Sequence, residues 1–142
     1  MNQSSAIIQS LQNKGIRTTK ARTFIIETLS DTDKLLSAGD IQTLLQRRHL
    51  PVNKTTVYRE LEFLKDQKIV EEIDLGEGKK RYELATTDHH HHIICVRCDQ
   101  IEHISLENDL IEEEKHITQR TNYKILHHTL EFFGVCTDCQ KV

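Results

Sequence analysis

Residues 53–84, NKTTVYRELEFLKDQKIVEEIDLGEGKKRYEL, change from a helical pattern to a strand pattern within one short stretch. Asn53 is a good helix-capping residue, and the apolar residues after it recur at the three-to-four spacing of a buried helix face: Val57, Leu61 and Leu64. Two strand-like runs, residues 69–74 and 79–84, then flank a turn that contains two glycines. The stretch therefore predicts a helix followed by a β-hairpin.

Three further helices are predicted upstream of this stretch. Their apolar residues repeat at helical spacing: Ile7, Ile8 and Leu11, then Phe24, Ile25 and Leu29, then Ile41, Leu44 and Leu45. Ser37 and Asp40 resemble a capping pair that would start the third helix, and Pro51 interrupts the helical pattern before the fourth. Helices followed by a two-stranded hairpin are typical of a winged helix that reads DNA with its last helix. A helical bundle that merely carries a hairpin fits the same pattern about equally well.

The remainder of the chain predicts a second, mixed unit. Its pattern gives four elements in order: a strand over 91–95, a strand over 101–104, a helix from 106 to about 119, and a strand over 123–133. Residues 85–88, ATTD, are short and polar and are the candidate linker. We therefore expect an α+β protein with an N-terminal winged helix over residues 1–84, a linker over 85–88 and a C-terminal α/β unit over 89–142.

The bulk composition limits the class of protein. The net charge is −3, but residues 1–84 hold 14 Lys and Arg against 12 Asp and Glu, whereas residues 85–142 hold 5 against 10. This small asymmetry fits a first half that faces DNA and a second half that holds cations. No apolar run approaches the roughly 20 residues that span a bilayer, and the N-terminus lacks the pattern of a signal peptide. We expect a soluble, cytoplasmic protein without a membrane partner.

Four cysteines form two Cys-x-x-Cys pairs, Cys95 with Cys98 and Cys136 with Cys139. In a reducing compartment such pairs are metal ligands more often than disulfides. Two pairs together complete the tetrahedral four-sulfur shell that zinc prefers, and a shell without an open position has a structural role. A redox function is the alternative, but a thioredoxin-like pair would not need a second pair.

Histidines gather after residue 84, where the run His89-His90-His91-His92 directly precedes the first cysteine pair. An expression tag would explain a histidine run, but this one lies inside the chain. Alternate side chains of a strand share a face, so one strand can supply two separate sites. On one face His90 and His92 can combine with Glu83 and His103, a set that suits zinc, iron(II), manganese or cobalt. On the other face His89 and His91 can combine with His128 and a helix carboxylate, for which the candidates are Glu107 and Glu112.

Together these motifs resemble the ferric uptake regulator (Fur) superfamily over nearly the whole chain, from about residue 14 to residue 139. The motifs are Thr56-Val57-Tyr58-Arg59, the histidine run leading into the first cysteine pair, and His128 followed by Gly134-Val135-Cys136-x-x-Cys139. The resemblance implies a homodimer that pairs through its C-terminal domains and binds double-stranded operator DNA. It also implies a metal-responsive repressor, with Tyr58 and Arg59 at the operator bases and Arg17 in the minor groove. The full set of predicted DNA contacts is Arg17, Lys20, Arg22, Lys54, Thr55, Thr56, Tyr58 and Arg59.

The resemblance also implies three metal sites. The four cysteines match the structural zinc site, while the regulatory site matches Glu83, His90, His92 and His103. The third site matches His89, His91 and His128, with Glu112 as our choice of carboxylate. Two departures stand out: Leu35 replaces a histidine that iron regulators often have, and His103 replaces a common glutamate.

These positions favour some regulatory ions over others. Peroxide sensors of the superfamily typically have aspartates around their iron, at positions where this chain has Glu83 and His103, so peroxide sensing is disfavoured. Iron(II) is our first choice, with control of iron-uptake genes. The alternatives are a zinc-uptake regulator, because three imidazoles and a carboxylate suit zinc, and a manganese-responsive one.

Two functions from other classes fit less well. A zinc hydrolase would need a general base beside a metal-bound water, and no His-Glu-x-x-His motif is present, so we expect no enzyme activity. A zinc-stapled interaction module without DNA binding would not need the Tyr58-Arg59 helix or the basic hairpin. A mobility-shift assay separates that module from a DNA-binding regulator.

Overall fold

The structure is a computed structural model that describes residues 3–85 and 90–141. The chain divides into two compact units, Met1–Ala85 (unit 1) and Thr86–Val142 (unit 2). Of the predicted linker over residues 85–88, only Ala85 is among the described residues, and His89 lies outside them. Among the described residues, no helix combines the length and apolar character that crossing a bilayer requires.

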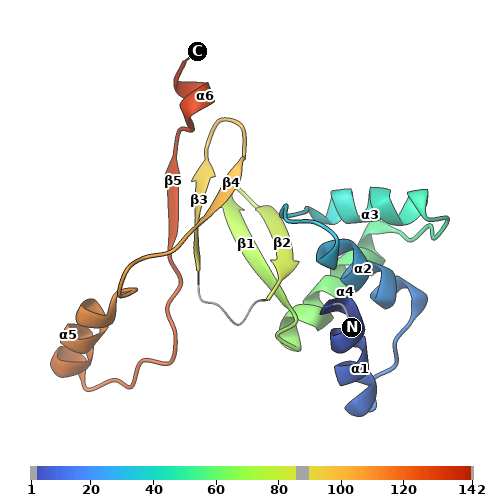
Figure 1. Cartoon of the computed structure of the whole chain (residues 1–142), viewed down its shortest axis with the longest axis horizontal. Helices are drawn as coiled ribbons and strands as arrows, with labels where there is room; N and C mark the ends of the chain where they lie inside the picture. The colour runs from blue at the N-terminus through green and yellow to red at the C-terminus, as the bar shows by residue number, and fades with distance from the viewer. Residues whose placement is uncertain (1–2, 86–89, 142) are drawn as a thin grey trace. The chain divides into compact units, whose positions relative to one another are not determined.

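Unit 1 consists of four helices followed by a hairpin (Figure 1). The elements are α1 (Gln3–Asn13), α2 (Lys20–Ser30), α3 (Ala38–Arg47), α4 (Lys54–Asp66), β1 (Val70–Gly76) and β2 (Lys79–Leu84). Ser37 and Asp40 form a reciprocal capping box at the start of α3, as predicted. The Asn53 side chain accepts a hydrogen bond from the backbone N–H of Thr56 and caps α4. The winged-helix arrangement expected from the sequence is confirmed.

The core of unit 1 is continuous from the helices to the hairpin. Its buried members come from every helix and both strands: Leu11, Ile25, Ile26, Leu29, Ala38, Ile41, Leu45, Val57, Leu61, Leu64, Val70, Tyr82 and Leu84. β1 and β2 pair antiparallel, and Leu36, just before α3, exchanges two backbone hydrogen bonds with Tyr82 of β2. The hairpin is therefore fixed to the helices both by apolar packing and by backbone pairing.

Unit 2 is a three-stranded sheet with two helices. Its elements are β3 (His91–Cys95), β4 (Ile101–Ile104), α5 (Ile111–Thr121), β5 (Glu131–Gly134) and α6 (Thr137–Gln140). β3 lies in the centre, antiparallel to β4 and parallel to β5. The predicted bounds of β3 and β4 are confirmed, and the mixed composition confirms the α+β class.

Two predicted elements of unit 2 have wrong bounds. The helix expected from Leu106 begins at Ile111, because Asn108, Asp109 and Leu110 all have left-handed backbone conformations with φ of 63°, 33° and 63°. The strand expected over 123–133 is limited to β5, because β3 offers pairing partners only from His92 to Cys95. The short α6 was not predicted at all.

Candidate metal sites and DNA-facing helix

Four cysteine side chains converge at one end of the unit 2 sheet. The pairing of Cys95 with Gly134 brings the turn after β3 beside the turn after β5, so that Cys98, Cys136 and Cys139 complete the group. All four sulfur atoms lie within 4.8 Å of one another, and the Sγ atoms of Cys98 and Cys136 are 3.8 Å apart. A tetrahedral zinc ion with Zn–S bonds of about 2.3 Å requires sulfur atoms about 3.8 Å apart. The predicted four-cysteine set therefore has the geometry of a zinc shell.

The electrostatics of this cluster favour a thiolate at Cys95. The pKa of Cys95 is lowered to about 6, because the backbone N–H groups of Cys136 and Cys98 donate to its sulfur. The pKa of Cys139 is raised to about 12 by its hydrogen bond with the Cys136 thiol and by burial. Arg97 also donates from Nη1 to the carbonyl oxygen of Cys139, at 3.0 Å, and ties the two turns together. The four sulfur atoms therefore differ: hydrogen bonds from the backbone favour a thiolate at Cys95, whereas the raised pKa of Cys139 favours a neutral thiol.

Three histidines of unit 2 form a second cluster. His92 lies opposite His103 in the β3–β4 register, and His90 directly precedes β3. Ring centroids are 4.4 Å apart for His90 and His103, 4.9 Å for His90 and His92, and 5.0 Å for His92 and His103. One ring nitrogen from each lies within 4.8 Å of the others. The structure thus brings together the three imidazoles that the sequence assigned to one site.

Glu83, the carboxylate predicted for the same site, belongs to unit 1. It lies next to the last residue of β2, opposite Glu71 in the hairpin register. Only seven positions of sequence separate Glu83 from His90, and they include the junction between the two units.

A third cluster of titratable groups surrounds His128. Asp109 Oδ1 lies 2.5 Å from Nε2 of His91 and 3.2 Å from Nε2 of His128, while Glu114 Oε1 lies 2.5 Å from Nδ1 of His128. The Glu114 carboxylate, followed by Asp109, raises the pKa of His128 above its usual value. The cluster joins β3, the turn before α5, the first turns of α5 and the segment that follows it.

The carboxylate predicted for this third site does not lie there. Glu112 is exposed and contacts Lys115 at 3.4 Å, whereas Asp109 and Glu114 lie beside the histidines. The later start of α5 explains the difference, because it changes which acidic residues face β3. The sequence shows acidic residues near residue 110, but which of them point toward the histidines depends on the turn over residues 108–110, which the sequence pattern does not predict. His89, the remaining predicted ligand, lies outside the described residues.

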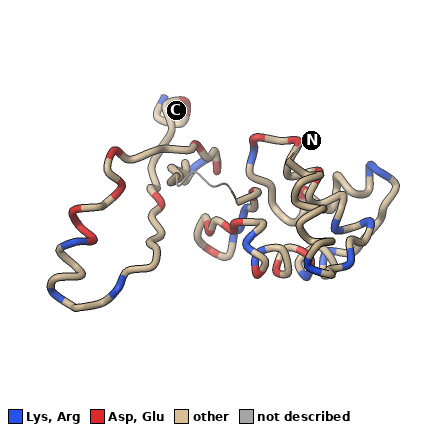
Figure 2. The backbone as a smooth tube through the Cα atoms, turned by 60° about the horizontal axis from the view of Figure 1, so that its bottom comes forward, with Lys and Arg blue, Asp and Glu red and all other residues tan. Residues whose placement is uncertain are grey.

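The predicted DNA contacts differ in how exposed their side chains are and in whether they are paired within the chain. On α4 the exposed predicted contacts are Lys54, Thr55, Tyr58 and Arg59, while Thr56 is half-buried at the capped start of the helix. Near α2, Arg17 is exposed in the segment before the helix and Lys20 is exposed at its first position. Arg22, which is also a predicted contact, differs from these residues: its guanidinium forms an ion pair with Glu60 of α4 and is only 14% exposed. Residues of both signs occur along both units (Figure 2), so the charge pattern alone does not mark one DNA-binding face.

Residues 13–133, most of the chain, match the Ferric uptake regulator family. This chain belongs to that family. Membership of the family confirms the prediction that this chain is a metal-responsive transcription regulator. Members of the family are DNA-binding, dimeric regulators and not enzymes.

Individual relatives agree with this assignment. The ferric uptake regulation protein of Bacillus subtilis is 32% identical over 97% of this chain and 95% of its own length. The peroxide-responsive repressor PerR of Staphylococcus saprophyticus is 31% identical over 94% of this chain and 88% of its own length. Among solved structures, the ferric uptake regulator of Francisella tularensis with iron has a TM-score of 0.79 and 27% identity, covering 89% of this chain and 96% of that one. Identity alone therefore does not separate iron regulation from peroxide sensing.

Proposed function

We propose that this chain is a homodimeric repressor that binds operator DNA when a regulatory metal is present, with iron(II) as the preferred ion and iron-uptake genes as targets. The observation that carries the proposal is the cluster of His90, His92 and His103 directly after the junction between a winged helix and a second unit. Its cytoplasmic location follows from DNA binding and stays a prediction.

The four cysteines are assigned a structural zinc ion. Their sulfur spacing fits its shell, and four thiolates leave no position for water or substrate. Such an ion ties β3 to the C-terminal segment after β5 and contributes its binding free energy to the folding of unit 2.

Glu83 is assigned as the fourth ligand beside His90, His92 and His103. Because Glu83 belongs to unit 1 and the histidines to unit 2, an ion held by all four restrains the junction between the units. An ion held by these four side chains would supply this restraint by coordination. The difference between its affinities for the restrained and free forms would set how far the population shifts toward DNA binding. Leu35 contributes no ligand, so Glu83 alone carries the coupling from unit 1.

The nature of these ligands bears on the choice of ion. Three nitrogens and one carboxylate suit iron(II), zinc and manganese, and the set contains no aspartate of the kind expected in a peroxide sensor. Zinc is therefore the second candidate. The third cluster is assigned a further ion held by His91, His128 and Asp109, with Glu114 positioning His128 and His89 as a possible extra ligand from the sequence prediction.

DNA recognition is assigned to α4 and the segment before α2. Lys20 and Lys54 contact phosphates, Tyr58 and Arg59 read bases in the major groove together with Thr55 and Thr56, and Arg17 reaches the minor groove. The side chains of Arg17, Lys20, Lys54 and Arg59 make no hydrogen bond or ion pair within the described part of the chain, which leaves their charges available. Replacing Arg59 should reduce sequence preference, whereas replacing Lys20 should weaken binding to all DNA about equally.

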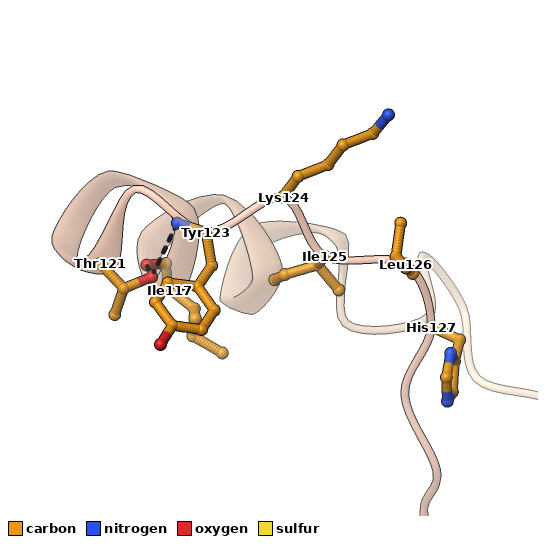
Figure 3. A pocket seen from close by; sticks show the side chains of 7 residues that line it. All are labelled: Ile117, Thr121, Tyr123, Lys124, Ile125, Leu126 and His127. Carbon is orange, nitrogen blue, oxygen red and sulfur yellow. Dashed lines mark hydrogen bonds between the residues drawn. The ribbon is translucent and has the colours of Figure 1, made fainter.

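Dimerisation is assigned to unit 2. Several of its large apolar side chains are exposed, among them Ile111, Ile117, Tyr123, Leu126 and Phe133. Several of them line a hollow of about 320 Å³ at α5 and the segment after it, together with Ile125. In Figure 3, Ile117 and Tyr123 lie side by side, whereas Leu126 points away from them. Exposed apolar surface of this kind is typical of a protein–protein interface. A second copy of the chain would cover it.

The experiment is DNA binding by the zinc-loaded protein against buffered free iron(II), manganese and zinc. Fluorescence anisotropy measures affinity for a duplex that the protein selects from a random library. Activation by iron(II) at micromolar free concentration, with manganese as its substitute, supports the proposal. Activation only by zinc at far lower free concentration would replace iron with zinc as the regulatory ion. Binding indifferent to all three ions would show that the absence of a histidine at Leu35 has uncoupled metal from DNA.

Two variants make this test specific to the regulatory site. His103→Ala removes one imidazole of the cluster and should shift the activating concentration of metal upward. His116→Ala is the matched control, because His116 is exposed on α5 and lies outside all three clusters. Equal shifts in both variants would contradict the assignment of His103.

A further inference from the structure

The Arg22 side chain joins two segments that are separated in sequence. Its Nε donates to Oε2 of Glu60 at 2.8 Å and its Nη2 to Oε1 at 3.3 Å, which makes a two-pronged pair with α4. Its Nη1 donates to the backbone carbonyl oxygen of Arg17 at 2.6 Å. The guanidinium carbon also lies 3.9 Å from the ring centroid of Phe63 on α4. All three nitrogens and one face of the group are therefore engaged inside the protein.

Both segments that Arg22 contacts carry proposed DNA contacts. Arg17 has an exposed side chain in the segment before α2. On α4, Glu60 directly follows Tyr58 and Arg59, and Phe63 lies one turn further on. Glu60 and Phe63 are three positions apart and share the helix face that turns toward Arg22, whereas Tyr58 and Arg59 are exposed. One buried guanidinium thus spans the distance between the minor-groove residue and the base-reading helix.

We infer that Arg22 is a positioning residue for DNA recognition: it fixes the backbone at Arg17 relative to α4, and does not itself contact phosphate. This inference rests on the proposed DNA-binding function. A side chain that is 14% exposed and paired with a carboxylate that is 16% exposed has lost its water shell on both sides. Its planar fork holds two carboxylate oxygens and a carbonyl at fixed angles, which a lysine ammonium does not reproduce.

The two possible roles of Arg22 predict opposite results for the conservative variant Arg22→Lys. A phosphate contact depends on charge, which lysine keeps, so operator affinity and its salt dependence would barely change. A brace depends on the shape of the guanidinium, so Arg22→Lys should lower operator affinity by about tenfold or more. Binding to a scrambled duplex of the same composition should change by less than about twofold, and the salt dependence should stay the same. Glu60→Gln should lower the ratio of operator to scrambled binding in the same way, although it removes a negative charge.

The chain contains a control for the chemical change at Arg48. Arg48 pairs with Glu27 at 3.0 Å and with Asp31 at 3.7 Å, and it lies 5.4 Å from the ring centroid of Phe24. It is more exposed than Arg22, at 42%, and none of these partners is a proposed DNA contact. Arg48→Lys repeats the same chemical change at an Arg, Glu and Phe set away from Arg17 and α4. Its operator affinity should equal that of the unsubstituted protein, and melting curves should show that both lysine variants remain folded.

The deciding measurement is a double-mutant cycle between Arg22 and Arg17 in the full-length, metal-loaded protein. If Arg22 acts by placing Arg17, then Arg17→Ala should weaken operator binding about tenfold in the unsubstituted protein but less than about twofold in Arg22→Lys. Equal losses in both backgrounds would overturn the inference while leaving Arg17 as a DNA contact. No operator preference in the unsubstituted protein would instead refute the proposed function, and the inference with it.

Discussion

The two units of this protein are held together in different ways. Unit 1 encloses a continuous apolar core to which all four helices and both strands contribute. In the described part of unit 2, the buried apolar residues are only Ile94 and Cys95, and α5 has no buried residue. Two histidines, His91 and His92, are instead among the most buried residues of unit 2, at 3% and 5% exposure. Unit 1 can thus rely on apolar burial, whereas we expect the stability of unit 2 to depend on metal ions and on a partner that covers its exposed apolar residues.

This difference agrees with the roles proposed for the two units, DNA binding for unit 1 and metal sensing for unit 2. A unit that presents α4 to DNA must keep a fixed shape, which a closed core provides. A unit that senses metal gains by making its own folding depend on the ligand, because the binding free energy then becomes folding free energy. If the units have these separate roles, a substitution in one unit should leave the stability of the other unchanged.

The largest effect is expected from Cys136→Ser in the zinc-loaded protein. Removing one of four thiolates should open the structural site, release the zinc ion, and unfold unit 2, because few apolar contacts remain there to replace it. Calorimetry should show the unit 2 transition disappear while the unit 1 transition stays, and sedimentation should show monomers. Thr137→Ala, an exposed neighbour, is the control and should retain zinc. Loss of both transitions together would show that the units do not fold independently.

A smaller effect, confined to the other unit, is expected from Leu61→Ala. Leu61 is fully buried in α4, so its truncation should leave a cavity and reduce the stability of unit 1 by about 2–5 kcal/mol. Denaturant titration measures this loss, and zinc content and the dimer dissociation constant should not change. A weaker dimer in this variant would contradict the separation of roles between the units.

Sequence reasoning succeeded where a local signal decides the structure. Ser37 and Asn53 cap their helices through residues three positions away, so the starts of α3 and α4 were predictable from a few neighbours. The two Cys-x-x-Cys pairs likewise carry their ligand spacing within four residues each. Alternation predicted that His90 and His92 lie on one face, because side chains two positions apart in an extended segment point the same way.

Sequence reasoning failed where contacts with residues distant in the chain decide the local structure. The length of β5 depends on how much of β3 is available for pairing, which the residues of 123–133 do not show. The start of α5 depends on Leu110 in a left-handed conformation, which is unusual for leucine and has no local signal. The same shift hid Asp109 and Glu114. The pairing of Arg22 with Glu60 could not be predicted either, because the two residues are 38 positions apart.

The dimer interface should respond to Leu126→Glu and unit 1 should not. Leu126 is 80% exposed in the single chain and borders the apolar hollow shown in Figure 3. If a second copy covers this surface, a buried carboxylate should raise the dimer dissociation constant at least about tenfold. Sedimentation equilibrium measures the change, with Thr129→Glu, exposed three positions further on, as a control for added charge. An unchanged dissociation constant would place the dimer surface elsewhere.

The smallest effect is expected from removing the N-terminal cap of α4, a feature that distinguishes this helix of unit 1 from α5 of unit 2. α4 has a side-chain cap, in which Asn53 Oδ1 accepts from the Thr56 N–H at 2.8 Å. α5 begins at Ile111, and Leu110, at its N-cap position, provides no side-chain hydrogen bond. Asn53→Ala should therefore lower the stability of unit 1 by about 1 kcal/mol, while Asn53→Asp keeps the acceptor and most of the stability. Because α4 carries Tyr58 and Arg59, the alanine variant should also fray the helix end that faces DNA. Hydrogen exchange at Thr56 and its neighbours measures this fraying directly. Equal exchange in the alanine and aspartate variants would mean that packing of Val57 and Leu61, and not the cap, holds the start of the helix.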